Sequence, residues 1–300
     1  MAADSQAAEE LVRRVETTFV DPLRTTASAL LPSRLADAGT QRAVQLICEA
    51  CIYTVLSCAL LLLLGLAEAG PISILLVAAP LADRLVLLLE ENRTNIYVLR
   101  LGSRRANRRT AAGLLCLFVG IAIGYATVAA WLGERGTVRV FAFAIDAADL
   151  HGENLVRRSF GAPLTVWGSN LRVALVIVCL GFVYRAYGGM LALAWNACVW
   201  SSVLTILLLR VESSSVGVRL LLAATVVPHL VCEASSYVLM ALAAIFASKA
   251  LATHERRDAR LRSAIRASFA LAALAIVGLA MSALYESWVL PYLVMAIASR

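Results

Sequence analysis

The sequence predicts an all-α polytopic membrane protein, a transmembrane helical bundle of about seven spans preceded by an N-terminal amphipathic helix. Of the 300 residues, 61% are hydrophobic and 16% are charged, and the mean hydropathy is +0.80. These values lie well beyond those of ordinary soluble domains. The formal net charge of +7 is therefore attributed to arginines that set membrane topology, and no nucleic-acid partner is expected.

The first 42 residues are expected to form cytoplasmic amphipathic helices, and residues 43–300 the transmembrane domain. Leu11, Val15 and Phe19 recur at helical spacing with charged side chains between them. Such a helix suits the membrane surface or the cytoplasmic ends of the bundle, and a dimerisation helix is the alternative. The segment lacks the basic region and apolar core of a signal peptide, so no cleavage is expected.

The first two spans are predicted at Ala43–Ala67 and Ile72–Leu89. Glu49 lies near the cytoplasmic end of the first, where its carboxylate is expected to reach the headgroup region. The second stretch is interpreted as a short, kinked or re-entrant crossing. Three residues that disfavour a regular span interrupt it: Pro80, Asp83 and Arg84.

Two arginine-rich segments set the predicted topology. Residues 90–110 form a polar loop before the third span, Ala111–Leu132, and a second basic loop separates the last two spans. By the positive-inside rule both loops are cytoplasmic, whereas the charge-balanced segment Gly133–Ser169 suits the opposite face. The topology-setting residues are Arg104, Arg105, Arg108, Arg109, Arg256 and Arg257.

The apolar block Asn170–Arg210 is about 40 residues long, roughly 60 Å as one helix and twice what a bilayer needs. It is therefore predicted to fold back as a tight hairpin, with Gly188-Gly189 as the turn. The last two spans are predicted at about 218–248 and 267–290. The N-terminus then lies inside and the C-terminus outside the cytoplasmic membrane.

A polar site is predicted in the central span, which Pro228 is expected to kink. His229 and Glu233 are four residues apart, so they share one helix face beside that proline. An interhelical hydrogen-bond pair that fixes packing is the favoured interpretation, and a proton or ligand site is the alternative. Asn196 either caps or bridges the kinked helix or is a third member of this cluster.

The sequence carries no pattern typical of an enzyme. A zinc site needs three or four ligands, yet His151 and His254 fall in predicted loops and only His229 lies in a span. All seven cysteines fall in apolar spans, where they act as small apolar residues. No phosphate-binding glycine loop and no nucleophile elbow is present, so no metal, cofactor or catalytic residue is expected.

Four motifs resemble the stage II sporulation protein M family of integral membrane proteins, over residues 170–291. In chain order they are Asn170-Leu171-Arg172-Val173-Ala174-Leu175, Leu191-Ala192-Leu193-Ala194-Trp195-Asn196, Pro228-His229 with Glu233, and Tyr285-Glu286-Ser287-Trp288-Val289-Leu290-Pro291. The proline-histidine followed by glutamate within a span is the most specific of them. Leu230 and Ala197 stand where the family usually has glycine, which implies a less close backbone approach there.

The resemblance implies a bacterial or archaeal membrane scaffold and no chemistry. The namesake of the family is the membrane member of a complex whose partners degrade peptidoglycan during engulfment. We therefore expect a non-catalytic scaffold or accessory subunit of an envelope-associated complex, with the lipid bilayer and membrane or envelope proteins as partners. The alternative is a permease component of a transporter with a polar midplane site. Asn170 is expected to start its helix, and Glu286 to be exposed near the outer interface.

The arginine distribution makes the topology testable. Single cysteines introduced between residues 100 and 109 or between residues 256 and 266, in a background without the native thiols, should react only with reagents that reach the cytoplasm. Cysteines within residues 133–169 should react from outside. Labelling of either arginine-rich segment by an impermeant external reagent would overturn the predicted topology.

Overall fold

The computed structural model describes most of the transmembrane domain, and all of its regular structure is helical. The described residues are 38–66, 69–100, 102–147, 163–210, 216–255 and 258–292. The amphipathic helices predicted within residues 1–42 fall almost entirely outside these ranges. Residues 38–42 belong to the first described helix.

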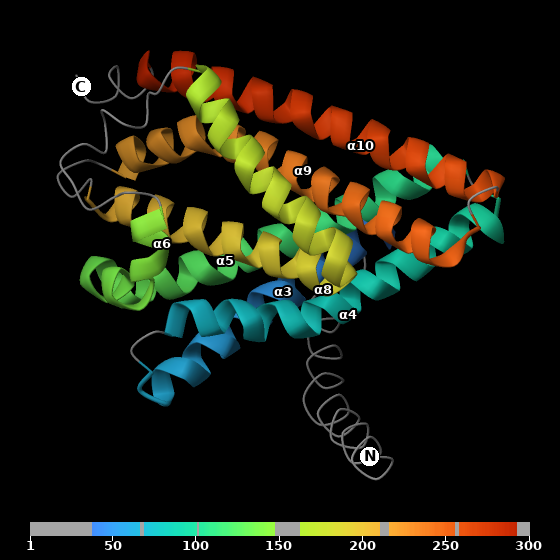
Figure 1. Ribbon diagram of the computed structural model, residues 1–300. Helices are drawn as coiled ribbons and strands as arrows, with labels where there is room; N and C mark the ends of the chain where they lie inside the picture. The colour runs from blue at the N-terminus through green and yellow to red at the C-terminus, as the bar shows by residue number, and fades with distance from the viewer. Residues whose placement is uncertain are drawn as a thin grey trace, which may run out of the picture.

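Six described helices are long and apolar enough to cross a membrane, which confirms the predicted all-α membrane bundle (Figure 1). A short helix, α6 (Ala142–Ala147), follows α5, and the C-terminal helix continues into a π-helix, η2 (Tyr285–Val289). The long helices are α3 (Ala38–Leu63), α4 (Ala69–Tyr97), α5 (Ser103–Val140), α8 (Pro163–Arg210), α9 (Val216–Thr253) and α10 (Ala259–Leu284).

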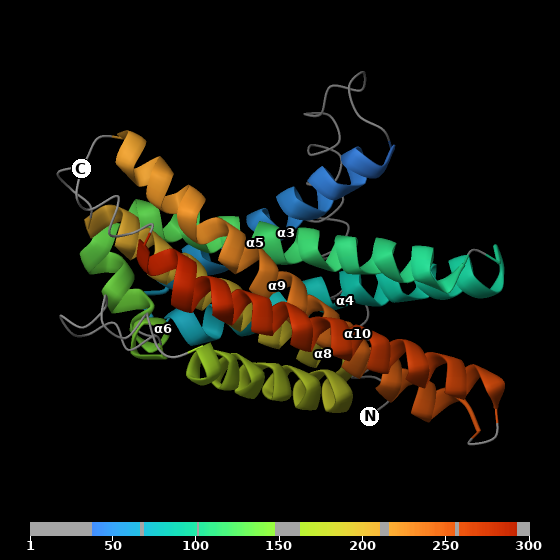
Figure 2. The same ribbon diagram turned by 90° about the horizontal axis from the view of Figure 1, so that it is seen from above.

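Helix α8 is a hairpin rather than one rod. Its 48 residues are interrupted at Arg185, which has φ 53° and ψ −126°, and the chain folds back there (Figures 1 and 2). The first arm (163–184) and the second arm (186–210) are each roughly 33 to 37 Å long at 1.5 Å per residue, enough to cross a bilayer. The predicted hairpin is therefore confirmed.

The residues that make the turn differ from those predicted. Neither Gly188 nor Gly189 has a positive φ; the left-handed residue is Arg185. Gly188 is needed for a different reason, since a Cβ there would lie 2.1 Å from the Leu180 carbonyl oxygen at the end of the first arm. The turn thus depends on close approach of the two arms.

Helix α4 corrects the expectation of a short or re-entrant second crossing. It is a continuous helix of 29 residues that passes through Pro80, Asp83 and Arg84. Arg84 is bound to Glu49 of α3, with 2.5 Å between Arg84 Nε and Glu49 Oε1 and both side chains mostly buried. The Glu49 carboxylate is therefore held within the bundle, where it neutralises the Arg84 guanidinium.

The arginine-rich segments lie at one end of the bundle. The α4–α5 and α9–α10 connections share that end (Figures 1 and 2), and the Arg260 guanidinium of α10 lies 5.8 Å from the centre of the Tyr97 ring of α4. Arg256 and Arg257 fall outside the described residues. Most of the polar loop predicted at residues 90–110 is helical, because α4 ends only at Tyr97 and α5 begins at Ser103. The other four topology-setting arginines therefore occupy the first turns of α5: Arg104, Arg105, Arg108 and Arg109.

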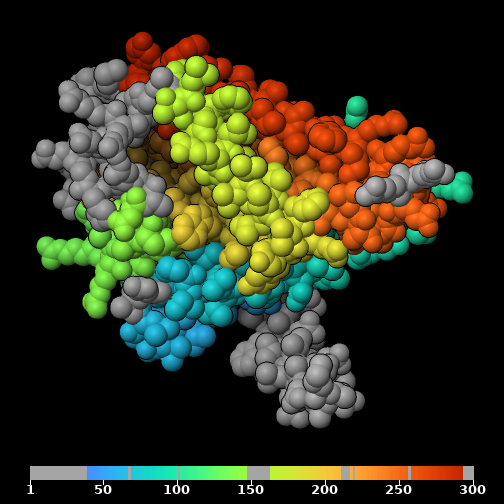
Figure 3. All heavy atoms as spheres, viewed as in Figure 1, coloured from blue at the N-terminus to red at the C-terminus, as the bar shows by residue number. Residues whose placement is uncertain are grey.

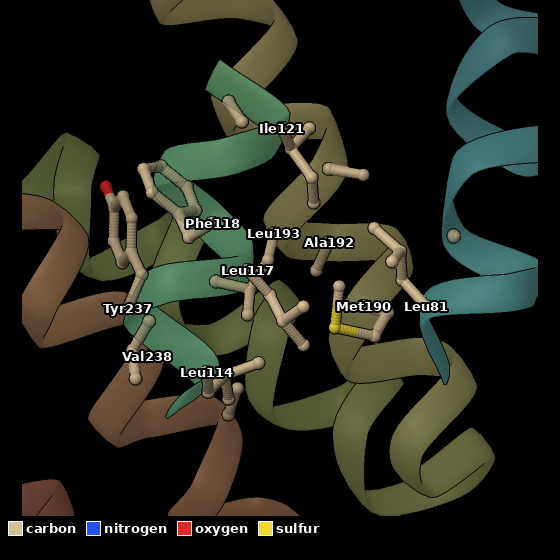
Figure 4. Packing of buried hydrophobic residues seen from close by; sticks show 14 of the residues in the cluster. Leu81, Leu114, Leu117, Phe118, Ile121, Met190, Ala192, Leu193, Tyr237 and Val238 are labelled. Atoms are coloured by element: carbon tan, nitrogen blue, oxygen red, sulfur yellow. The ribbon is translucent and has the colours of Figure 1, made fainter. Parts of the chain in front are cut away.

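Helix α5 lies at the centre of the buried core. Its side chains Leu114, Leu117 and Ile121 are fully buried and lie between residues of α8 and α9 (Figure 4). On its other side α5 packs closely on α3, because a Cβ at Gly120 would lie 2.3 Å from the Ile47 carbonyl oxygen and one at Gly124 would lie 2.6 Å from Thr54 Cβ. The first arm of α8 then covers the front of the bundle between α10 and α4 (Figure 3).

The α3–α5 contact predicts a strong effect of a single methyl group. Gly120→Ala forces the two backbones apart and should lower the free energy of unfolding by about 1 to 3 kcal/mol. Gly168→Ala is the matched control, because a Cβ at Gly168 meets nothing within 4 Å and alanine favours the helix. Unfolding in mixed micelles measures both, and equal stability of the two variants would contradict the packing described.

The α8 turn predicts a difference between adjacent glycines. Gly188→Ala should impair folding of the hairpin, since its methyl group meets backbone at 2.1 Å. Gly189→Ala should be mild, because its nearest neighbour is the flexible tip of Ile245 at 3.0 Å. The yield of monodisperse protein after detergent extraction compares them, and a turn centred on both glycines would make them equally harmful.

Candidate functional site: a buried polar cluster between helices α9 and α10

Helix α9 carries the predicted polar pair on one buried face. Pro228 lies inside the helix, which continues on both sides of it, although its ring removes the backbone hydrogen bond to Ala224. One and five residues further on, His229 and Glu233 are 8% and 6% exposed. His229 Nε2 lies 3.3 Å from Glu233 Oε2, so the pair that the spacing predicts is present.

The His229 ring also contacts α10 through both of its nitrogens. Nδ1 lies 2.8 Å from Ser282 Oγ and 3.3 Å from the Ser282 carbonyl oxygen. Nε2 lies 3.4 Å from Glu286 Oε2 in addition to the Glu233 carboxylate. The imidazole is therefore the bridge between the two helices, with a carboxylate from each helix at the same nitrogen.

The second oxygen of Glu233 connects this cluster to the core. The Tyr237 hydroxyl donates a hydrogen bond of 2.7 Å to Glu233 Oε1 from one helical turn away. The Tyr237 ring lies 5.8 Å from the Trp200 ring of α8, and Trp200 lies 5.5 Å from Phe118 of α5, measured between centroids. Figure 4 shows Tyr237 beside Phe118, with its hydroxyl directed out of the apolar cluster.

A π-helical turn places Glu286 in the cluster. Residues Tyr285–Val289 form the π-helix η2, whose extra residue per turn changes which side chains face α9. The Glu286 side chain is 22% exposed and faces His229. The predicted exposure of Glu286 is therefore wrong, since its side chain is the second carboxylate of the site.

Small residues bring the two helices close on either side of the cluster. Cys232 Sγ lies 3.4 Å from the Gly278 carbonyl oxygen, and a Cβ at Gly278 would lie 2.2 Å from Ser236 Oγ. Beyond His229, the Tyr285 hydroxyl donates to the Thr225 carbonyl oxygen at 2.9 Å. Small residues and interhelical hydrogen bonds of about 0.6 to 2 kcal/mol each are what hold helices together in lipid.

The two predicted asparagines lie outside the cluster. Asn196 donates to the Ala192 carbonyl oxygen one turn back in its own helix, at 2.8 Å. Asn170 does not start its helix, because α8 begins at Pro163, and its buried Nδ2 has no hydrogen-bond partner. Trp167 Nε1 and Ser287 Oγ are likewise buried without partners.

Sequence analysis missed three members of the site. Tyr237 could have been found, because it follows Glu233 at the same four-residue spacing that links His229 to Glu233. Ser282 and Tyr285 lie on another helix, and nothing in the sequence sets the rotation of α10 about its axis. Their contribution depends on the packing of α10 against α9.

The ionisable groups of the cluster can hold a shared proton. An imidazolium with two carboxylates carries a net charge of −1, and one further proton makes the group neutral. None of these side chains lines the described apolar groove of about 360 Å³ formed by α5, α8 and α9. Among the described residues, no group of three or more His, Cys, Asp or Glu is arranged to hold a metal ion.

The comparisons with known proteins identify a family. The model of the family described as Stage II sporulation protein M matches residues 113–291, which begin in α5 and include α8, α9 and the cluster-bearing part of α10. No curated protein and no solved structure matches the chain. Because the match spans more than half of the 300 residues, this multi-pass membrane protein belongs to the stage II sporulation protein M family.

Proposed function

We propose that this protein is a non-catalytic scaffold or accessory subunit of an envelope-associated complex in the cytoplasmic membrane. The observation that carries the proposal is the bridge that His229 makes across the α9–α10 interface: it is bound to Ser282 of α10 while it pairs with Glu233 of its own helix. These groups use their hydrogen-bonding capacity on one another, so they stabilise one arrangement of the helices. A scaffold needs such a fixed arrangement because its partners bind to the surface it presents.

The burial of the cluster supports this use. His229 and Glu233 are 8% and 6% exposed, and Tyr237 is 1% exposed. A catalytic or transport site must admit a substrate or an ion, whereas a packing site gains from excluding everything else. Leaving one of these polar groups unpaired in such surroundings costs about 1 to 3 kcal/mol, so the cluster opposes sliding of α9 along α10.

The proposed orientation follows from the arginine-bearing end of the bundle. With that end in the cytoplasm, the N-terminus lies inside and the C-terminus outside. Partners are then membrane or envelope proteins that reach the N-terminal segment, residues 133–169 or the arginine-rich end, and the lipid bilayer surrounds the helices. Nucleic acid has no part in this function, and neither does a cofactor.

One observation favours a second candidate, a permease component of a transporter. The Glu286 side chain is 22% exposed and lies on a π-helical turn, a feature frequent at functional sites. Glu286 could thus receive a proton from outside the cluster and exchange it with His229 and Glu233. On this alternative the protonatable carboxylates are essential, and their hydrogen-bonding geometry alone is not sufficient.

Replacing Glu233 separates the two functions. Glu233→Gln keeps an acceptor for Tyr237 and a donor toward His229, so a scaffold should keep its stability within about 1 kcal/mol and its complex intact. Glu233→Leu leaves the Tyr237 hydroxyl without its acceptor and removes one of the two carboxylates at His229 Nε2, so it should destabilise the protein by about 1 to 3 kcal/mol. Unfolding in mixed micelles measures the stability of each variant, and recovery of the complex from membranes measures whether the complex stays intact.

Proton flux supplies the second half of this test. Proteoliposomes containing the full chain and a pH-sensitive dye should show no flux under an imposed membrane potential if the protein is a scaffold. Flux that Glu233→Gln and Glu286→Gln both abolish would establish the transporter instead. Ser235→Ala is the matched control, because the Ser235 hydroxyl bonds only to the Val231 carbonyl of its own helix. A Glu233→Leu protein that is both fully stable and fully active would sink both candidates.

A further inference from the structure

Asp83 lies in the membrane-spanning part of α4 and has no partner in the part of the chain that the structure describes. It is exposed, and no described residue forms an ion pair or hydrogen bond with it. The adjacent arginine does not neutralise it, because Arg84 is bound to Glu49. Every other charged side chain at this level of α3 and α4 is therefore paired, and Asp83 leaves one uncompensated carboxylate on the outer surface of the bundle.

The position of Asp83 makes exposure to lipid costly. The apolar part of α4 spans residues 72–89, so Asp83 lies about six residues, or roughly 9 Å, from its arginine-bearing end. A carboxylate side chain is too short to reach the interface over that distance. A charged residue facing hydrocarbon costs on the order of 2.5 to 3.5 kcal/mol even on insertion scales, and such residues usually face protein or water.

The residues around Asp83 form a helix-packing seam. Ile72, Leu76, Ala79, Asp83 and Val86 are all exposed and follow one another at alternating intervals of four and three. This 3.5-residue period keeps one stripe facing a partner helix along its whole length, as in left-handed helix pairs. Ala79, one turn before Asp83, leaves room for a close approach. We refer to these five residues as the α4 seam.

We propose that the α4 seam binds one transmembrane helix of a partner protein that carries an arginine or lysine at the depth of Asp83. The negative charge of Asp83 identifies the partner. An uncompensated carboxylate in the cytoplasmic half of the membrane is neutralised by a helix with a basic residue and not by a purely apolar helix. This inference rests on the proposed scaffold function and names the chemistry of its partner. The seam lies in α4, outside the family-matched residues 113–291.

A second copy of this chain fits the seam less well. Two copies in one membrane have the same orientation, so a symmetric pair of seams places the two Asp83 carboxylates at the same depth and opposite each other. Like charges at short range oppose such a dimer. Two cations beside α4 are already paired as well, since Arg84 of α4 binds Glu49 and Lys249 of α9 binds Glu90 of α4.

A designed helix tests the recognition directly. Single-span leucine-alanine peptides carrying one arginine six residues from their cytoplasmic end are reconstituted with the full-length protein, and association is measured by energy transfer between labels. The arginine peptide should associate about tenfold more tightly than the same peptide with glutamine, and Asp83→Leu should remove the difference. An arginine placed in the outer half of the peptide should give no advantage.

Charge exchange protects the test against a folding defect. Asp83→Arg should reject the arginine peptide and bind a peptide with aspartate at the same depth, which a misfolded protein cannot do. Equal association of arginine and glutamine peptides with the unmodified protein would overturn the proposal. So would association that survives Asp83→Leu unchanged, because the seam would then bind helices through apolar contact alone.

Cross-linking in cells identifies the natural occupant. A photoreactive amino acid at Ala79 or Val86 should form an adduct with a different protein whose span contains a basic residue, and Asp83→Leu should abolish that adduct. The exposed α10 positions Phe269 and Val277 are the controls. Adducts only with lipid, or only with a second copy, would contradict the proposal. They would leave the scaffold function to be judged by the Glu233 variants, which act at a separate site.

Discussion

Water is absent from the hydrocarbon layer, so a polar group that lies there is stabilised only by a partner within a protein. For its buried ionisable groups the chain supplies such partners by placing polar residues in matched sets on facing helices. Arg84 of α4 is neutralised by Glu49 of α3, and His229 of α9 is bound by Ser282 and Glu286 of α10. These pairings fix which helices are neighbours, because leaving them incomplete costs more than the weak preference of apolar helices for one another.

The order and type of the elements could be predicted from the sequence because hydropathy acts locally. Six long apolar helices, the hairpin within residues 163–210 and a common end for the two basic segments all follow from run length and arginine position. The errors arose where local rules compete with tertiary contacts. Asp83 and Arg84 suggested an interrupted span, but Arg84 is paired across the α3–α4 interface, so α4 continues as a regular helix.

The candidate site could be predicted only in part for a related reason. The four-residue spacing of His229, Glu233 and Tyr237 is visible in the sequence, since all three lie on α9. The contribution of α10 depends on how that helix is rotated, and the π-helical turn at Tyr285–Val289 changes this rotation by an amount that hydropathy does not record. The α8 turn was also predicted only in part. Glycine preference pointed to Gly188-Gly189, whereas the residue with a positive φ is Arg185, and Gly188 is needed because it lies close to Leu180 of the first arm.

The two membrane-embedded acidic sites differ in one respect that separates their roles. Glu233 has its partners within the chain: Tyr237 and His229 lie one helical turn to either side of it on α9, and His229 in turn contacts α10. Asp83 has no partner among the described residues, although it lies on a helix whose other ionic groups are paired. A satisfied cluster stabilises the fold that contains it, whereas an unsatisfied carboxylate on the surface stabilises only an assembly that supplies the missing cation. In the proposed scaffold, the internal cluster would hold α9 against α10, and the outward-facing aspartate would provide the specificity for a partner helix.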